Sequence, residues 1–355
     1  MKQEHIFLKE KIYRWTIFLA ALFIIIAATL EAQSFITIFL LAAFVSIISV
    51  HPVQWLDKKK VPHGLSVMLV LLGFLLIISG LSGIVGGSIS SFTSHLGNYE
   101  NRLQEISQSL YSTLKNYGVE LSMEHLSNMF DPVKVLDYTA NTLSQLGNLM
   151  SNMALIFFIV MFVLLEMNSI ALKANLFGIV TKKRKTVSSL SRIESSIRHY
   201  LVIKTLVSLL TGVMIGVWLW ILGIEYPILW ALIAFLLNYI PNIGSIVAAI
   251  PTLIFAWIQK DFAMSIWVLS GYAFTNMLIG YYIEPRVMGR GMGLSTLVVF
   301  LSLIIWGYLL GLVGMFLSVP LTMILKIILE NSEETKAFAA ILGTDDDAKK
   351  LLEKR

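Results

Sequence analysis

Long apolar windows recur along this chain, and they restrict its possible folds more than any other feature. Several are about 20 residues long, which is the length that a helix needs to cross the hydrocarbon core of a bilayer. The composition agrees, because 57% of the residues are hydrophobic and only 14% are charged, whereas average apolar usage is about 45–50%. The sequence therefore predicts an all-α, polytopic membrane protein.

Five full spans are expected before the C-terminal region, each bounded by charged or turn-forming residues. They are Trp15–Leu30, Phe35–Val50, Leu65–Val85, Leu149–Leu165 and Leu201–Leu222. Between the third and fourth spans, Ser88–Asn148 is polar with leucines at helical spacing, and it predicts a small helical insertion outside the bilayer. The first span has no small-residue cleavage pattern after it and is expected to remain as an anchor.

The distribution of lysine and arginine predicts the orientation. Lys58–Lys60 follows the second span and Lys182–Lys185 follows the fourth, and such clusters mark cytoplasmic loops. The insertion has more acidic than basic residues, which suits the opposite side. Both termini are therefore expected in the cytoplasm, with the chain in the cell (inner) membrane. The predicted regions are three spans, the insertion, a fourth span, a basic linker, a C-terminal core and a tail: 1–87, 88–148, 149–166, 167–200, 201–328 and 329–355.

The count of crossings in the C-terminal core predicts a helical hairpin at Ile228–Ile258. The fifth span leaves the cytoplasm, and the loop that carries Arg286 and Arg290 is expected to return there, so an odd number of crossings lies between them. One crossing is Ala263–Ile283. The hairpin segment is too short for two spans of about 20 residues, and the motif "NYIPNIG" lies at its centre. The alternative is one long helix with a proline kink.

A second hairpin is expected at Ser295–Leu325, which begins beside one arginine and ends beside a lysine, with "WGYLLGLVG" in its middle. With about five to six full spans, the two hairpins complete the predicted fold. Two glycine pairs, Gly212–Gly216 and Gly307–Gly311, have the spacing that lets membrane helices approach closely. Helix packing is the expected role of both pairs.

Breaks in apolar helices indicate a binding site. An unpaired backbone group in hydrocarbon costs several kcal/mol unless protein or a water-filled cavity satisfies it, and secondary transporters use discontinuous helices to hold a substrate or an ion. Amides and hydroxyls near the break are then the candidate ligands, although such groups also join membrane helices. The candidate substrate-binding residues are Asn238, Pro241, Asn242, Gly244, Ser245, Asn276 and Glu284.

The C-terminal half resembles that of the autoinducer-2 exporter (AI-2E) family of membrane transporters. The similarity lies in "NYIPNIGSIVAAIP", in "IEPRVMGRGMG" and in the glycine-rich run that ends in "VPL", and the order of the regions extends it over nearly the whole chain. It implies a secondary transporter that exports a small polar solute, such as the quorum-sensing signal autoinducer-2, or a sodium (lithium)/proton antiporter. It also implies a homo-oligomer, with a pentamer among the candidate assemblies. One departure is Lys204, where many members carry glutamine.

Side-chain chemistry favours the polar solute. An antiporter needs a carboxylate inside the membrane, and the candidates lie at span ends or beside cations: Glu31, Glu166, Asp261 and Glu284. A neutral, hydroxyl-rich solute needs amides, hydroxyls and aromatic faces, which the core supplies, including Thr275, Tyr239 and Trp306. A third possibility is a scaffold without transport activity whose external insertion binds a partner, and the breaks argue against it.

No catalytic motif is found. The chain has no phosphate loop, no HExxH zinc pair and no nucleophile elbow, and the lack of cysteine excludes disulfides and thiolate metal sites. We expect no enzymatic activity, no cofactor, no metal and no nucleic-acid partner. The expected partners are the lipid bilayer and either a small polar solute or a monovalent cation and a proton.

Overall fold

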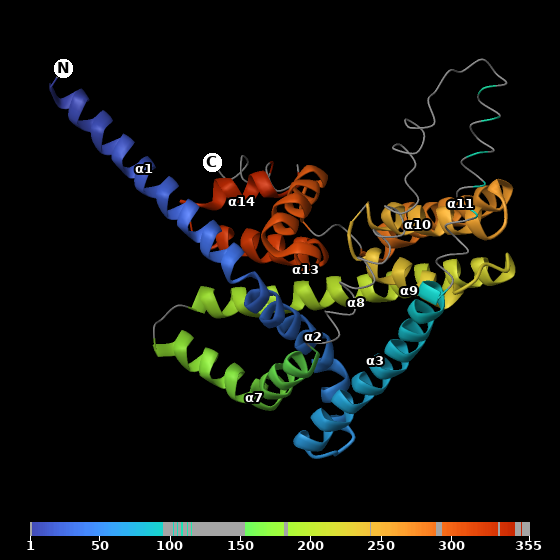
Figure 1. Ribbon diagram of the computed structural model, residues 1–355. Helices are drawn as coiled ribbons and strands as arrows, with labels where there is room; N and C mark the ends of the chain where they lie inside the picture. Colours follow the sequence, from blue (N-terminus) through green and yellow to red (C-terminus); the bar gives the residue numbers. More distant parts are fainter. Residues whose placement is uncertain are drawn as a thin grey trace. The chain divides into compact units, whose positions relative to one another are not determined.

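A computed structural model describes residues 2–94, 102, 105, 108, 112, 115, 153–180, 184–241, 243–288, 293–332, 334–344 and 349, and the predicted insertion therefore lies almost wholly outside the described residues. The helices are α1 (Lys2–Glu31), α2 (Gln33–Lys58), α3 (His63–Ser94), α7 (Met153–Val180), α8 (Arg184–Ile221), α9 (Pro227–Leu237), α10 (Gly244–Gln259), α11 (Phe262–Asn276), the π-helix η1 (Met277–Ile283), α12 (Glu284–Met288), α13 (Thr296–Glu330) and α14 (Lys336–Leu342) (Figure 1).

Apolar helices dominate, and the predicted fold class is confirmed. Five of the described helical segments are long and apolar enough to cross a membrane: Gln33–Lys58, His63–Ser88, Arg192–Ile221, Phe262–Met288 and Thr296–Glu330. Shorter apolar helices include Met153–Met167 and the two helices that flank the "NYIPNIG" motif. The chain is thus a polytopic helical membrane protein with short apolar helices beside its full-length spans.

The chain divides into two compact units, and each draws on distant parts of the sequence. One unit contains 1–47, 158–193 and 293–355, and the other contains 48–157 and 194–292. Three long helices, α2, α7 and α8, run from one unit into the other. The units are described separately below.

In the second unit, α9 and α10 form a hairpin. The Trp230 ring on α9 contacts the Phe255 ring on α10, with 5.4 Å between their centroids, whereas these residues would be about 37 Å apart along one straight helix. The chain reverses through residues 238–243, where the Pro241 carbonyl accepts a hydrogen bond from the Ile243 amide at 2.7 Å. The segment is therefore two short helices, as predicted, and not one kinked helix.

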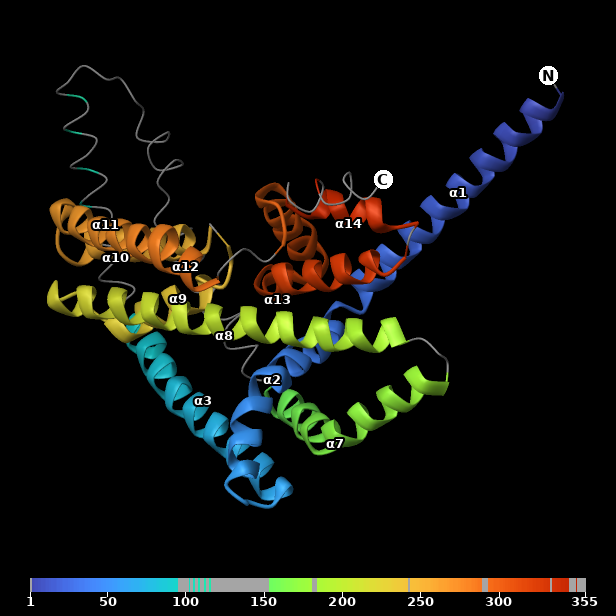
Figure 2. The same cartoon turned by 180° about the vertical axis from the view of Figure 1, so that it is seen from behind.

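Close backbone approach requires a glycine just after this turn. A Cβ atom placed on Gly244 would lie 1.7 Å from the Leu237 carbonyl oxygen, which no side chain can tolerate. The hairpin also packs closely on α8, because a Cβ on Gly216 would lie 2.8 Å from the Ala231 Cβ, and Gly212 meets the same part of α9. The predicted packing role of this glycine pair is confirmed. Figures 1 and 2 show α8, α9, α10 and α11 side by side.

The first unit contains the second predicted hairpin, within α13. The Trp306 indole donates to the Thr322 hydroxyl at 3.1 Å, although 16 residues of straight helix would place the two about 24 Å apart. The bend is at Gly311, whose φ of 63° and ψ of −146° lie near a region that essentially only glycine occupies. A Cβ on Gly314 would lie 1.9 Å from the Trp306 carbonyl oxygen. The pair Gly307–Gly311 thus belongs to a chain reversal.

Charged groups hold the two ends of the α13 hairpin together. Lys326, which is buried, donates to the Gly293 carbonyl oxygen and lies 3.7 Å from Glu330. Glu330 also pairs with Arg192 on α8. The Ser295 amide donates to the Leu342 carbonyl at 3.2 Å, so α14 docks against the start of α13. Lys326 thus stabilises the α13 hairpin by joining its end to the segment before its start.

The hairpin geometry predicts which glycines tolerate a methyl group. We expect Gly314→Ala to lower the midpoint of thermal unfolding by several degrees, because its Cβ would overlap the Trp306 carbonyl oxygen and the cost of forced backbone movement is about 1–3 kcal/mol. Gly73→Ala is the matched control, since a Cβ there meets nothing within 4 Å. Tryptophan fluorescence of the purified protein measures both midpoints. Equal midpoints would contradict the reversal within α13.

Candidate functional site

A row of polar side chains follows one face of α8 inside its apolar span. Tyr200, Lys204 and Ser208 are spaced four residues apart, and this spacing places side chains on one face of a helix. Thr205 lies beside them. All except Thr205 are buried, although this segment belongs to a candidate membrane span, Arg192–Ile221. We call these four residues the polar row.

Lys204 forms a buried ion pair with Glu284. The Lys204 Nζ lies 2.6 Å from the Glu284 Oε1, and the exposed fractions of the two side chains are 4% and 21%. A lysine near the end of a membrane helix ordinarily extends its ammonium group to water. Here the ammonium group is enclosed by protein, so Lys204 does not reach the interface, and its charge is balanced by the carboxylate.

The π-helix η1 comes immediately before Glu284 and sets the direction of its side chain. Each additional residue in a helical turn rotates the following side chains by about 100°, and π-helical segments are frequent at functional sites. Arg286 is only two residues from Glu284 in the sequence, but its guanidinium lies over the Tyr282 ring, 3.6 Å from the ring centroid. Glu284 instead pairs with Lys204 of α8.

Apolar side chains pack beside the ion pair. Ile203 and Val207 of α8 form a buried cluster with Ile279 of η1. In such surroundings the attraction between two charges does little more than offset their loss of hydration, whereas removal of one partner leaves an uncompensated charge and costs about 3–5 kcal/mol. The pair is therefore weak evidence for stability. An ionisable group within a membrane span is more often functional.

The polar row also contacts the turn between α9 and α10. The Asn238 side-chain amide donates to the Ser208 hydroxyl at 3.0 Å, and the Tyr239 hydroxyl donates to the Thr205 hydroxyl at 2.7 Å. The predicted break and Glu284 thus meet on the same helix face. The Tyr200 hydroxyl is buried and has no hydrogen-bond partner among the described residues.

The other predicted site residues make no contact with the polar row that the structure describes. Pro241 and Gly244 shape the turn, and Ser245 is half-buried in the first turn of α10. Asn276 ends α11, is half-buried, and makes no side-chain hydrogen bond to a described residue. Asn242 lies outside the described residues. The structure therefore brings Asn238 and Glu284 to one helix and does not show such a link for Asn276.

Two other carboxylates considered from the sequence have ordinary roles. The exposed Glu166 pairs with Lys173, at 2.7 Å between Oε1 and Nζ, and Asp261 caps α11 by accepting the Met264 amide at 2.7 Å. Sequence analysis missed Tyr200 and did not assign Lys204 to the site. A lysine within an otherwise apolar run was the available signal, because such a residue needs a partner.

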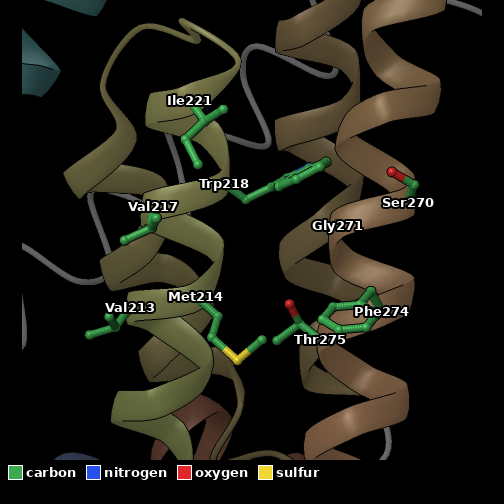
Figure 3. A pocket seen from close by; sticks show the side chains of 9 residues that line it. All are labelled: Val213, Met214, Val217, Trp218, Ile221, Ser270, Gly271, Phe274 and Thr275. Carbon is green, nitrogen blue, oxygen red and sulfur yellow. The ribbon is translucent and has the colours of Figure 1, made fainter.

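A separate cavity of about 600 Å³ lies between α8 and α11 (Figure 3). Trp218 reaches across it to Gly271, where a Cβ would lie 2.1 Å from the indole ring, and the other lining residues are mostly apolar. Thr275, a candidate polar contact from the sequence, lines this cavity. The cavity contains none of the predicted substrate-binding residues, and its apolar wall does not suit a polar solute.

The described residues contain no group of three or more histidine, cysteine, aspartate or glutamate side chains that could hold a metal ion. The chemistry available at the polar row is therefore that of one carboxylate, one ammonium, three hydroxyl-bearing side chains of α8 and the hydrogen-bonded groups of the turn. Such a set can bind hydroxyl and carbonyl groups, and it can exchange a proton or a monovalent cation.

The chain is similar over most of its length to known transport proteins. The family model described as "AI-2E family transporter" matches residues 16–334. The AI-2 transport protein TqsA of Escherichia coli is 38% identical over 92% of this chain and 94% of its own length. A Haemophilus influenzae relative is 37% identical over 95% and 98%, and YhhT of Escherichia coli is 34% identical over 92% and 93%.

The match of the family model thus runs from the first apolar helix to beyond the α13 hairpin, and it covers the polar row and both chain reversals. With three relatives above 30% identity over nearly their full lengths, the chain belongs to the AI-2E family of transporters.

Proposed function

We propose that this chain is a secondary transporter that exports a small polar solute, such as the autoinducer-2 signal, across the cell (inner) membrane. The observation that carries the proposal is the contact between the broken helix and the polar row, which gathers amide, hydroxyl and charged groups within apolar spans. The similarity to TqsA, which is named an AI-2 transport protein, supports the choice of solute.

The proposed substrate site comprises the turn between α9 and α10 together with Glu284 and Asn276. Pro241 lacks a backbone donor and leaves carbonyl groups near the turn available. Asn238, Asn242 and Ser245 then supply amides and a hydroxyl, which suit a neutral solute rich in hydroxyl groups. Gly244 lets the chain pass close enough to form the turn. The proposed substrate site therefore offers several uncharged polar groups and one carboxylate.

Sodium (lithium)/proton antiport is the second candidate, and Glu284 is the observation that favours it. Glu284 is a carboxylate paired with a buried lysine inside candidate spans, and antiport requires a carboxylate that can exchange a proton for a cation. Vesicles that contain only this protein separate the candidates. Solute export without sodium movement supports the first, and sodium movement driven by a proton gradient supports the second.

If the α9–α10 turn binds the solute, substitution of its asparagine side chains should reduce export. We expect Asn238→Ala to reduce solute export about tenfold, because one hydrogen bond to the solute or to the polar row is lost, and Asn242→Ala to abolish it. Asn331→Ala is the matched control, since Asn331 is an exposed residue at the end of α13. Uptake by inverted vesicles measures all three. Parental rates in both turn variants would place the site elsewhere.

The proposed orientation can be tested by cysteine labelling, because the chain has no cysteine of its own. With Ser88–Asn148 outside, Ser112→Cys should react with a membrane-impermeant maleimide added to intact cells. Lys173→Cys, an exposed position in the predicted cytoplasmic linker Met167–Tyr200, should react only after the cells are opened. The reverse pattern would overturn the orientation, which rests on the positions of the lysine and arginine clusters.

A further inference from the structure

Three features in and beside the polar row are not needed for the proposed export of a neutral solute. Lys204 and Glu284 form a buried ion pair at 2.6 Å. The Tyr200 hydroxyl, one helical turn before Lys204, is buried and finds no hydrogen-bond partner in the described part of the chain. The segment that presents Glu284 follows a seven-residue π-helix. A carboxylate, an ammonium and an unused oxygen ligand therefore lie together in an apolar part of the chain.

Stability alone does not account for this arrangement. A buried pair is often no more stabilising than apolar residues of similar volume, and apolar residues would leave no carboxylate to balance. The Tyr200 oxygen could accept or donate a hydrogen bond, yet it has no partner among the described residues. Together, Glu284, Lys204 and the Tyr200 hydroxyl have the chemistry of a site in which one carboxylate binds one positive charge.

We propose that Glu284 forms a monovalent-cation site and that the Lys204 ammonium group occupies this site as a covalently attached cation. An ammonium group is a compact positive charge, and here it takes the position that a sodium or lithium ion would take against the carboxylate. The wild-type chain then needs no dissolved cation at this position. The inference deepens the proposed function, on which it rests for the transport step that the site serves.

The surrounding charges agree with a single positive occupant. Lys204 contacts Glu284 from α8, and the Tyr239 hydroxyl of the α9–α10 turn donates to Thr205, the residue after Lys204. Arg286 of α12 lies over the Tyr282 ring. Lys204 is the ion-pair partner that the described residues give Glu284, so the pair joins one negative and one positive charge, which suits a monovalent ion.

Lys204→Gln tests the proposal, because glutamine removes the charge and supplies a neutral amide of similar reach. The purified full-length variant is heated in sodium, lithium or choline chloride at one ionic strength, and unfolding is followed by tryptophan fluorescence. We expect sodium or lithium to raise the unfolding midpoint of the variant by at least about 2 °C over choline, since a ligand that binds only the folded state stabilises it. The wild-type midpoint should be the same in all three salts.

Two controls identify the site. Lys204→Arg keeps the positive charge and should not respond to sodium, and the double variant Lys204→Gln/Glu284→Gln lacks the carboxylate and should not respond either. If Lys204→Gln yields no folded protein in any salt, the unfolding midpoint of Lys204→Met is measured in the same three salts. A higher midpoint in sodium or lithium than in choline supports the proposal, and equal midpoints contradict it.

The proposal is overturned if the neutral variant shows no salt response, if wild type responds equally, or if the response persists without Glu284. Each result is read from unfolding and not from transport. A failure of solute export in vesicles would therefore contradict the proposed function while leaving this measurement intact, and the two failures are distinguishable.

Discussion

Every backbone amide and carbonyl group within hydrocarbon must find a partner in the protein, and this requirement governs how the chain can reverse inside its apolar segments. Both hairpins meet it by close contact between the outgoing and returning helices. Gly244 passes against the Leu237 carbonyl oxygen, and Gly314 passes against the Trp306 carbonyl oxygen. Two segments with different sequences thus share one physical solution, in which a missing side chain lets helix ends pack against each other.

Helix α8 connects this backbone arrangement to the chemistry. Its glycines at 212 and 216 let α9 approach closely, and its polar row, one to three turns earlier, receives Asn238 from the turn and Glu284 from the end of η1. A movement of the hairpin against α8 would therefore change the surroundings of the polar row. The central claim of our account is that Lys204 on α8 and Glu284 form one ion pair, which joins the end of η1 to the helix face that the α9–α10 turn also contacts.

The sequence predicted the fold in outline because its signals are strong ones. Proline and glycine in an apolar run predict a reversal, and both reversals are present at the predicted segments. The ion pair could not be predicted in the same way, because Lys204 and Glu284 are 80 residues apart and the π-helix that directs Glu284 has no sequence signature. Arg286 is far nearer to Glu284 in the sequence, yet it lies over the Tyr282 ring. The orientation, the region boundaries and a homo-oligomer stay predictions.

A double-mutant cycle on the ion pair tests the central claim most directly. Unfolding midpoints are measured for Lys204→Met, Glu284→Gln and the double variant in choline buffer, where no small cation replaces the lysine. Our account predicts that each single variant is strongly destabilised, by about 3–5 kcal/mol, and that the double variant is more stable than either, because no buried charge remains. Additive losses in the double variant would show that the two charges are not in contact, and would contradict the account.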